Sequence, residues 1–144
     1  MRKLLSIFIL VFLVSLLIGC SGGNGVLPPP SQQAEKFVGM WVNEDQQNIY
    51  IIVARCNIEL IGKKLYIDIW TRVGISSENY IGQFVVDSNE ANDGDIEITF
   101  ASGFGDYVQI ITRINDRLKI HTTYYPFNPT GSVWTEIDYL IKTS

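Results

Sequence analysis

Apolar and polar residues alternate along most of the chain after residue 36, a period-two pattern typical of β-strands that bury one face. The stretch LYIDIW at 65–70 shows it clearly, and no helical window longer than a turn or two interrupts the alternation. The second predicted segment is long and apolar, with an interruption near Arg55. The pattern predicts eight strands: Met40–Asn43, Asn48–Leu60, Leu65–Arg72, Tyr80–Asp87, Ile96–Ala101, Asp106–Ile114, Leu118–Tyr125 and Val133–Lys142.

Turn residues separate these segments at hairpin spacing, including Gly62-Lys63-Lys64, Asp93-Gly94 and Asn115-Asp116. Eight strands joined in this way predict an all-β, antiparallel up-and-down barrel, since closure removes exposed strand edges. We expect one apolar row of each strand to point into the barrel. The expected inward rows are Leu65, Ile67 and Ile69; Ile96, Ile98 and Phe100; Val108, Ile110 and Ile114; Leu118 and Ile120; and Val133, Ile137, Tyr139 and Ile141.

The N-terminus has a different pattern. Two basic residues, Arg2 and Lys3, precede an apolar run from Leu4 to Gly19 whose only polar members are Ser6 and Ser15. This is the layout of a secretory signal. The run is short for a spanning helix, which needs about 20 apolar residues.

The run ends in Leu17-Ile18-Gly19-Cys20, which resembles the lipobox of bacterial lipoproteins. The resemblance implies cleavage before Cys20 and attachment of lipid to its thiol. An ordinary signal peptide, or an uncleaved anchor with a chance cysteine, is the alternative. Ser21, in place of Asp, follows the cysteine, and the sorting rules of that family then imply a cell-envelope protein anchored to the outer membrane and facing the periplasm, if the cell has two membranes.

Three regions follow from these signals. Residues 1–19 are the predicted signal peptide, 20–36 a lipidated cysteine with a flexible tether, and 37–144 the barrel domain. The tether prediction depends on SGGNGVLPPPSQQ at 21–33, in which Gly, Pro and Ser dominate. The barrel segment has about the length of one domain.

Charge and cysteine content narrow the class of protein. Arg2 and Lys3 are two of the 11 basic residues, so the mature chain retains nine against 15 acidic residues, a net charge of −6. Nucleic acid is therefore not an expected partner, because its binding requires clustered basic residues. With Cys20 lipidated, Cys56 has no disulfide partner in its own chain, and we expect it to be a buried apolar side chain.

The start of the first strand, Phe37 to Asn43, contains a Gly-x-Trp motif at Gly39 and Trp41. This motif resembles the opening of lipocalin-type barrels, and FVGMWVNED, GKKLYIDIW, DRLKIHTTYY and the final YLIK are together similar to small bacterial lipocalin-like proteins. The resemblance implies that Gly39 and Trp41 close one end of the barrel. Those relatives often carry a Cys-His-Pro-type loop after a tryptophan, whereas TRVGISSENY follows Trp70 here, so no metal or disulfide role is carried over.

The sequence offers no set of residues typical of catalysis. His121 is the only histidine and has no nucleophile motif beside it. Glu136 and Asp138 share one face of the last strand, which we interpret as solvated. The oxygen-rich stretch 87–95 lacks the spacing of a calcium loop, since Ala91 stands where a ligand should be. We therefore expect no enzyme activity, no metal and no cofactor.

Aromatic residues provide the candidate binding surface. Tyr66, Trp70, Tyr107, Tyr125 and Trp134 lie on the faces opposite the expected inward rows, together with Asp68, Arg113 and His121. If part of this face points inward, it lines a polar-aromatic pocket; if it points outward, it forms an exposed aromatic surface. The first hypothesis is a barrel that binds a small apolar or amphipathic ligand and shows an unfilled cavity near Trp41. The alternative is a protein-interaction module, an inhibitor or accessory subunit of an envelope protein, that uses an outer patch around Trp70, Tyr125 and Trp134.

One loop bears on the alternative. Ser102-Gly103-Phe104-Gly105-Asp106-Tyr107 faintly resembles the Ser-Gly loop of periplasmic lysozyme inhibitors, which are also small lipoprotein barrels. The spacing to Tyr107 is one residue longer here.

Overall fold

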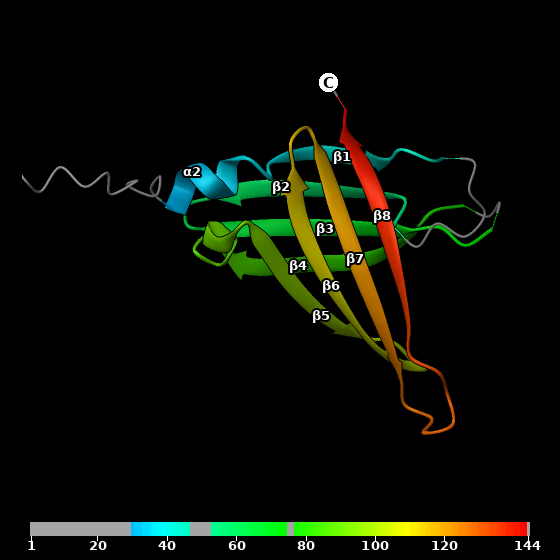
Figure 1. The fold of residues 1–144 in the computed structure, drawn as a ribbon. Coiled ribbons are helices and arrows are strands. Elements are labelled where there is room, and N and C mark those ends of the chain that lie inside the picture. The colour runs from blue at the N-terminus through cyan, green and yellow to red at the C-terminus, as the bar shows by residue number, and fades with distance from the viewer. Residues whose placement is uncertain (1–29, 47–52, 75–76, 144) are drawn as a thin grey trace, which may run out of the picture.

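The computed structural model describes residues 30–46, 53–74 and 77–143, which form one antiparallel sheet that almost closes into a barrel (Figure 1). A short helix, α2 (Pro30–Glu35), precedes the sheet, and a 3₁₀ helix, η1 (Glu90–Asp93), follows the fourth strand. The predicted signal peptide, Cys20 and residues 48–52 lie outside the described residues. The strands are β1 (Gly39–Asn43), β2 (Arg55–Ile61), β3 (Lys64–Thr71), β4 (Asn79–Asp87), β5 (Asp95–Ala101), β6 (Gly105–Ile114), β7 (Arg117–Pro126) and β8 (Trp134–Lys142).

Strands that follow one another in sequence pair with each other, except that β4 and β5 do not. The order is β4-β3-β2-β1-β8-β7-β6-β5, and β1 joins β8 through pairs such as Trp41 with Lys142. The predicted all-β, up-and-down barrel is therefore confirmed, with β4 and β5 as its two edges. In Figure 1 these two strands approach each other near η1 and diverge toward their opposite ends. We call the gap between them the β4–β5 seam.

Side chains bridge the seam where backbone hydrogen bonds do not. The rings of Phe84 from β4 and Phe100 from β5 lie 5.3 Å apart between centroids. Near η1 the chain turns tightly, since Gly94 adopts a left-handed φ of 87° and donates its N–H to the carbonyl of Ala91. The polar stretch 87–95 thus forms a helical turn with Ala91 buried in the core.

Trp41 occupies the end of the barrel beside α2. It is fully buried, and its Nε1–H donates to the carbonyl of Phe37 at 2.8 Å. The guanidinium of Arg113 lies 4.8 Å from the centre of its ring. Arg113 also donates to the carbonyls of Lys36 and Arg117, which ties the β6–β7 hairpin to the start of the domain. This end of the barrel is filled by protein side chains.

The short helix before β1 packs against the barrel. Helix α2 lies within the segment 20–36 that was expected to be tether, and its Ala34 is buried against the core. Ala34 and Phe37 supply the apolar surface that packs this helix against the core. The Gly- and Pro-rich composition of 21–33 had indicated few side chains that could be buried there. Within the part of the chain that the structure describes, no helix has the length and apolar character needed to cross a membrane.

The expected inward rows are confirmed for β3, β5 and β7 and wrong for β6 and β8. In β6, Gln109 and Ile111 are buried, whereas Val108 and Ile110 face outward and are partly exposed. The more aliphatic face of β6 is the outward one, and the inward face carries Tyr107 and Gln109 beside Ile111, so its alternation predicts the wrong orientation. Pairing decides the orientation, because Gln109 lies opposite the inward-facing Ile98 of β5 and Thr122 of β7.

The predicted inward and outward faces of β8 are also exchanged. Asp138 and Leu140 are buried, and the predicted apolar row is exposed. Leu140 pairs with the buried Leu118 and Asp138 with the buried Ile120, so the neighbouring β7 fixes this orientation. The residues of the exposed row are Val133, Ile137, Tyr139 and Ile141.

Candidate ligand site at the open seam

The diverging ends of β4 and β5 leave a cavity of about 360 Å³. It lies between the ends of β3 and β4 on one side and those of β5, β6 and β8 on the other. Aromatic, aliphatic and hydroxyl side chains surround it. The lining residues are Thr71, Val73, Tyr80, Ile81, Phe100, Ala101, Ser102, Tyr107 and Trp134.

A row of aromatic rings forms one wall. Cross-strand register places Phe100, Tyr107, Tyr124 and Trp134 side by side on the inner faces of β5 to β8. Phe100 and Tyr107 stack at 5.0 Å with an interplanar angle of 7°, and Tyr124 lies 4.9 Å from Tyr107 and 5.4 Å from Trp134. Burial and the nearby Tyr124 raise the pKa of Tyr107. We call these four residues the aromatic row.

A second row lies one register step deeper and contains polar groups. Its members are Ile98, Gln109, Thr122 and Glu136. Gln109 and Thr122 are fully buried, and the Gln109 Nε2 donates to the Thr122 Oγ1 at 3.2 Å. Within the described part of the chain, the buried Gln109 Oε1 has no hydrogen-bond partner. The barrel therefore holds an unpaired acceptor beneath its aromatic row.

Two carboxylates also face inward, which corrects the predicted solvated face of β8. Asp138 accepts hydrogen bonds from the Asn43 Nδ2 at 2.8 Å and from the Val53 N–H at 3.1 Å. Burial raises the pKa of the Asp138 carboxyl, and these two hydrogen bonds oppose the shift. Burial and the charge of Asp138 raise the pKa of Glu136. Both lie against a second hollow, of about 280 Å³, that residues 43–45 also line.

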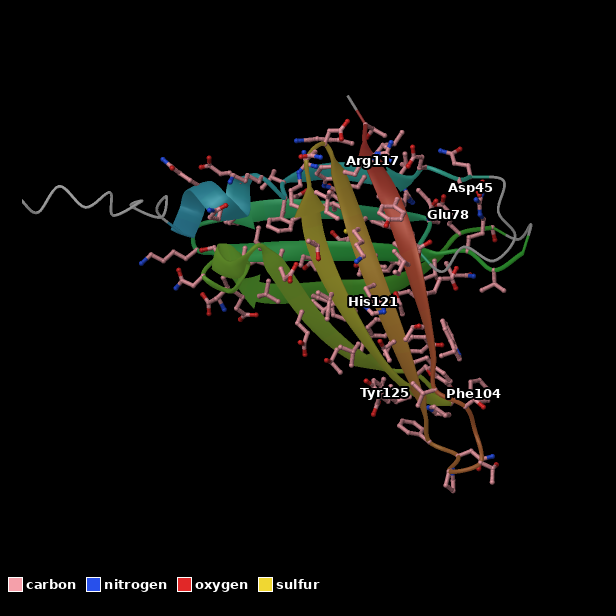
Figure 2. The ribbon with its side chains drawn as sticks, viewed as in Figure 1. Asp45, Glu78, Phe104, Arg117, His121 and Tyr125 are labelled. Carbon is pink, nitrogen blue, oxygen red and sulfur yellow. The ribbon has the colours of Figure 1, made fainter. Side chains whose placement is uncertain are left out.

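Metal-ligand chemistry has no geometric support in residues 30–46, 53–74 and 77–143. No three His, Cys, Asp or Glu side chains among them gather closely enough to hold a metal ion. Cys56 is fully buried, as expected, and burial together with the charge of Asp68 raises the pKa of its thiol. His121 lies on the outer face of β7, between Ile110 and Ile137 of the neighbouring strands (Figure 2).

The structure divides the aromatic residues that the sequence grouped together. Tyr107 and Trp134 line the cavity, whereas Tyr66 and Trp70 lie on the outer face of β3. Trp70 contacts Tyr80 at 5.1 Å between ring centroids, and the Arg55 guanidinium lies 4.1 Å from its ring. Trp70 and Trp134 therefore lie on different faces of the sheet, and Tyr80, which contacts Trp70, also lines the cavity. Arg113 lies at the opposite end of the barrel, against Trp41.

Exposed aromatics form a separate feature beside the cavity mouth. The Phe127 N–H donates to the carbonyl of Phe104 at 3.0 Å, and the Tyr124 hydroxyl donates to the same carbonyl at 2.9 Å. These bonds join the 102–105 loop to the β7–β8 loop. Phe104, Tyr125 and Phe127 are all exposed, and Figure 2 shows Phe104 and Tyr125 together at this end of the molecule. We call these three residues the aromatic knob.

Sequence reasoning missed several residues of the site. Phe100, which lines the cavity, was expected in the core, and Tyr124 and Gln109, which lie next to the lining residue Tyr107, were not singled out. These residues can be identified only from the strand register. Tyr107, Gln109 and Ile111 share one face of β6, and the pairing with β5 and β7 shows that this face points inward. Trp41, near which a cavity was expected, is fully buried; its Nε1–H bonds to the Phe37 carbonyl and its ring contacts Arg113.

Comparison of the chain with protein-family models, curated protein sequences and solved structures gave no match. The candidate site is therefore interpreted from its own geometry.

Proposed function

We propose that this protein is a lipid-anchored lipoprotein of the cell envelope that binds a small, neutral, apolar or amphipathic ligand and does not convert it chemically. The cavity at the β4–β5 seam carries the proposal. Its lining includes four aromatic rings and no Asp, Glu, Lys, Arg or His. Concave sites of roughly 300–1,000 Å³, mainly apolar with a few polar groups, are typical of small-molecule binding.

The expected affinity is modest. A ligand that buries about 200 Å² of apolar surface in the cavity gains roughly 5 kcal/mol from desolvation. Association entropy offsets part of this gain. Burial of this surface alone therefore corresponds to a dissociation constant no tighter than about 0.2 mM, and tighter binding requires a ligand that buries more surface or forms hydrogen bonds.

Native mass spectrometry tests ligand binding directly. The full chain, expressed with its own signal and transferred from membranes into nanodiscs, should carry a stoichiometric small-molecule adduct. The Thr71→Trp variant should lose it, because the larger side chain fills the cavity, and Thr71→Val, which keeps the volume, should retain it. An adduct that persists in Thr71→Trp, or a chain without any adduct that also takes up no added apolar probe, would contradict the proposal.

The anchor is a separate part of the proposal, and the lipobox-like sequence at 17–20 supports it. Two or more acyl chains are needed for stable membrane attachment. We expect intact mass analysis to show cleavage between Gly19 and Cys20 and a lipid-modified N-terminus. Cys20→Ala should retain residues 1–19 and lack the lipid. Cleavage at another position, or an unchanged mature mass in Cys20→Ala, would indicate an ordinary signal peptide.

The aromatic knob favours a second candidate function, a protein-interaction module. Phe104 is 81% exposed and Phe127 is 59% exposed, and exposed apolar patches often mark partner surfaces. A photo-crosslinking residue at position 104 or 127 should then capture one discrete envelope protein in intact cells. Position 61, where Ile61 is 58% exposed at the end of β2, is the matched control. Equal capture at all three positions, or none, would count against this candidate.

A further inference from the structure

We propose that the side-chain amide oxygen of Gln109 accepts a hydrogen bond from a ligand bound in the seam cavity. The ligand is a neutral, mainly apolar molecule that carries one donor, a hydroxyl or N–H, at the end that points into the barrel. This inference depends on the proposed ligand-binding function and specifies the class of ligand.

The main observation is the unpaired amide oxygen. Gln109 is 0% exposed, its amide nitrogen donates to Thr122, and its Oε1 has no partner among residues 30–46, 53–74 and 77–143. Buried polar groups in native proteins are nearly always hydrogen-bonded, because an unsatisfied acceptor loses its bond to water and gains nothing in return. A ligand donor would supply the missing bond.

The position of Gln109 relates it to the cavity. On the inner face of β6, the next residue toward the mouth is Tyr107, which lines the cavity. Two residues along a strand span roughly 7 Å. Tyr107 and Tyr124 lie above Gln109 and Thr122 in the same register. A ligand that displaces these two rings from the mouth would bring its leading atoms to the Gln109 Oε1.

The surrounding charges restrict what the leading group can be. Glu136 lies opposite Thr122 in the same row, and Asp138 follows it on the inner face of β8. The lining of the cavity contains no cationic side chain. An anionic head group, such as the carboxylate of a fatty acid, would face a carbonyl oxygen and a carboxylate without a compensating cation. A neutral donor meets none of these penalties.

Three probes of one shape separate the possibilities: anthracene, 1-aminoanthracene and anthracene-9-carboxylate. The full chain in nanodiscs is titrated with each, and native mass spectrometry counts bound probe per chain, with empty nanodiscs as the background. We expect 1-aminoanthracene to bind roughly tenfold more tightly than anthracene, the ratio that one buried hydrogen bond typically supplies. The carboxylate should bind least.

Two variants assign this preference to Gln109. Gln109→Met, which keeps the length of the side chain, and Gln109→Leu should bind anthracene and 1-aminoanthracene equally. Gln83→Leu is the matched control, because Gln83 is exposed on β4 and donates to Asp68 on the outer surface. It should keep the tenfold preference. Thermal unfolding of each variant confirms that it is folded before binding is compared.

The outcomes distinguish the two proposals. Wild-type protein that binds none of the probes overturns the ligand-binding function itself. Wild-type protein that binds anthracene and 1-aminoanthracene equally, or a folded Gln109→Met variant that keeps the preference, overturns the role of Gln109 and leaves the cavity as a purely apolar site. Tightest binding of the carboxylate overturns the assignment of a neutral ligand.

Discussion

At the scale of single residues, the inner surface of this barrel combines apolar side chains with a small number of buried polar groups. Asp138 accepts hydrogen bonds from Asn43 and Val53. Among the described residues, Gln109 bonds to Thr122 through its amide nitrogen, and its amide oxygen has no partner. Buried polar groups reduce stability unless they are fully paired. Their presence beside the cavities is consistent with a site in which some stability is given up for recognition.

Glu136 provides a pH-dependent test of this arrangement. Its pKa is raised in the folded protein, so the native carboxyl holds its proton more tightly than the unfolded one. Stability should therefore fall as pH rises from the ordinary pKa of a glutamate through the raised value. Glu136→Gln removes this loss, so the variant should be more stable than wild type at about pH 8 and nearly equal to it at about pH 3, below the ordinary pKa of a glutamate.

Urea unfolding at the two pH values measures the effect. Glu97→Gln is the matched control, because Glu97 is exposed on the outer face of β5. A stability difference that is the same at both pH values would show that Glu136 contributes through packing and not through its charge.

At the scale of the elements, strand limits were predictable from local patterns and strand orientation was not. The predicted segments from 65 onward agree with β3 to β8 to within a residue or two. Turn chemistry explains this agreement, as at Asn115, whose positive φ of 55° fits the tight β6–β7 turn. The prediction of which faces of β6 and β8 point inward was wrong, because both strands carry apolar residues on both faces. A shift of one residue exchanges the two faces, and only the neighbouring strands select between them.

The glycines of the 102–105 loop offer a test at this scale. A Cβ on Gly105 would meet the Tyr125 carbonyl and the Tyr124 ring, whereas a Cβ on Gly103 would meet nothing within 4 Å. Gly105→Ala should therefore lower the free energy of unfolding by about 1–3 kcal/mol, as overpacked positions do. Gly103→Ala should change it by less than about 0.5 kcal/mol, as exposed substitutions do. Equal effects in denaturant unfolding would show that β6 and β7 are not this close at the aromatic knob.

At the scale of the whole molecule, the barrel is a meander closed through β1 and β8 and left open between β4 and β5. Trp41 and Arg113 fill the end beside α2, and the seam widens into the cavity at the other end. The seam cavity lies beside this opening. The opening also leaves the two edge strands with hydrogen bonds on one side only.

Hydrogen exchange should report this asymmetry. Amides of β7, which pairs with both β6 and β8, should exchange slowly. The seam-facing amides of β4 and β5 should exchange faster, because they form no hydrogen bond to a neighbouring strand. Adding 1-aminoanthracene should slow exchange at the start of β4 and the end of β5 and leave β2 unchanged. Uniform slow exchange across all eight strands would indicate that the seam is closed in solution.

The sequence by itself determined that this is an all-β chain, where most strands begin and end, and which rows of β3, β5 and β7 point inward. These features are local, since alternation and turn residues act over a few positions. The tertiary structure alone decided the orientation of β6 and β8, the location of the seam, and the position of Gln109 beneath the aromatic row. Those features depend on pairing between segments far apart in the chain, as between Trp41 and Lys142, and no local pattern encodes such pairing.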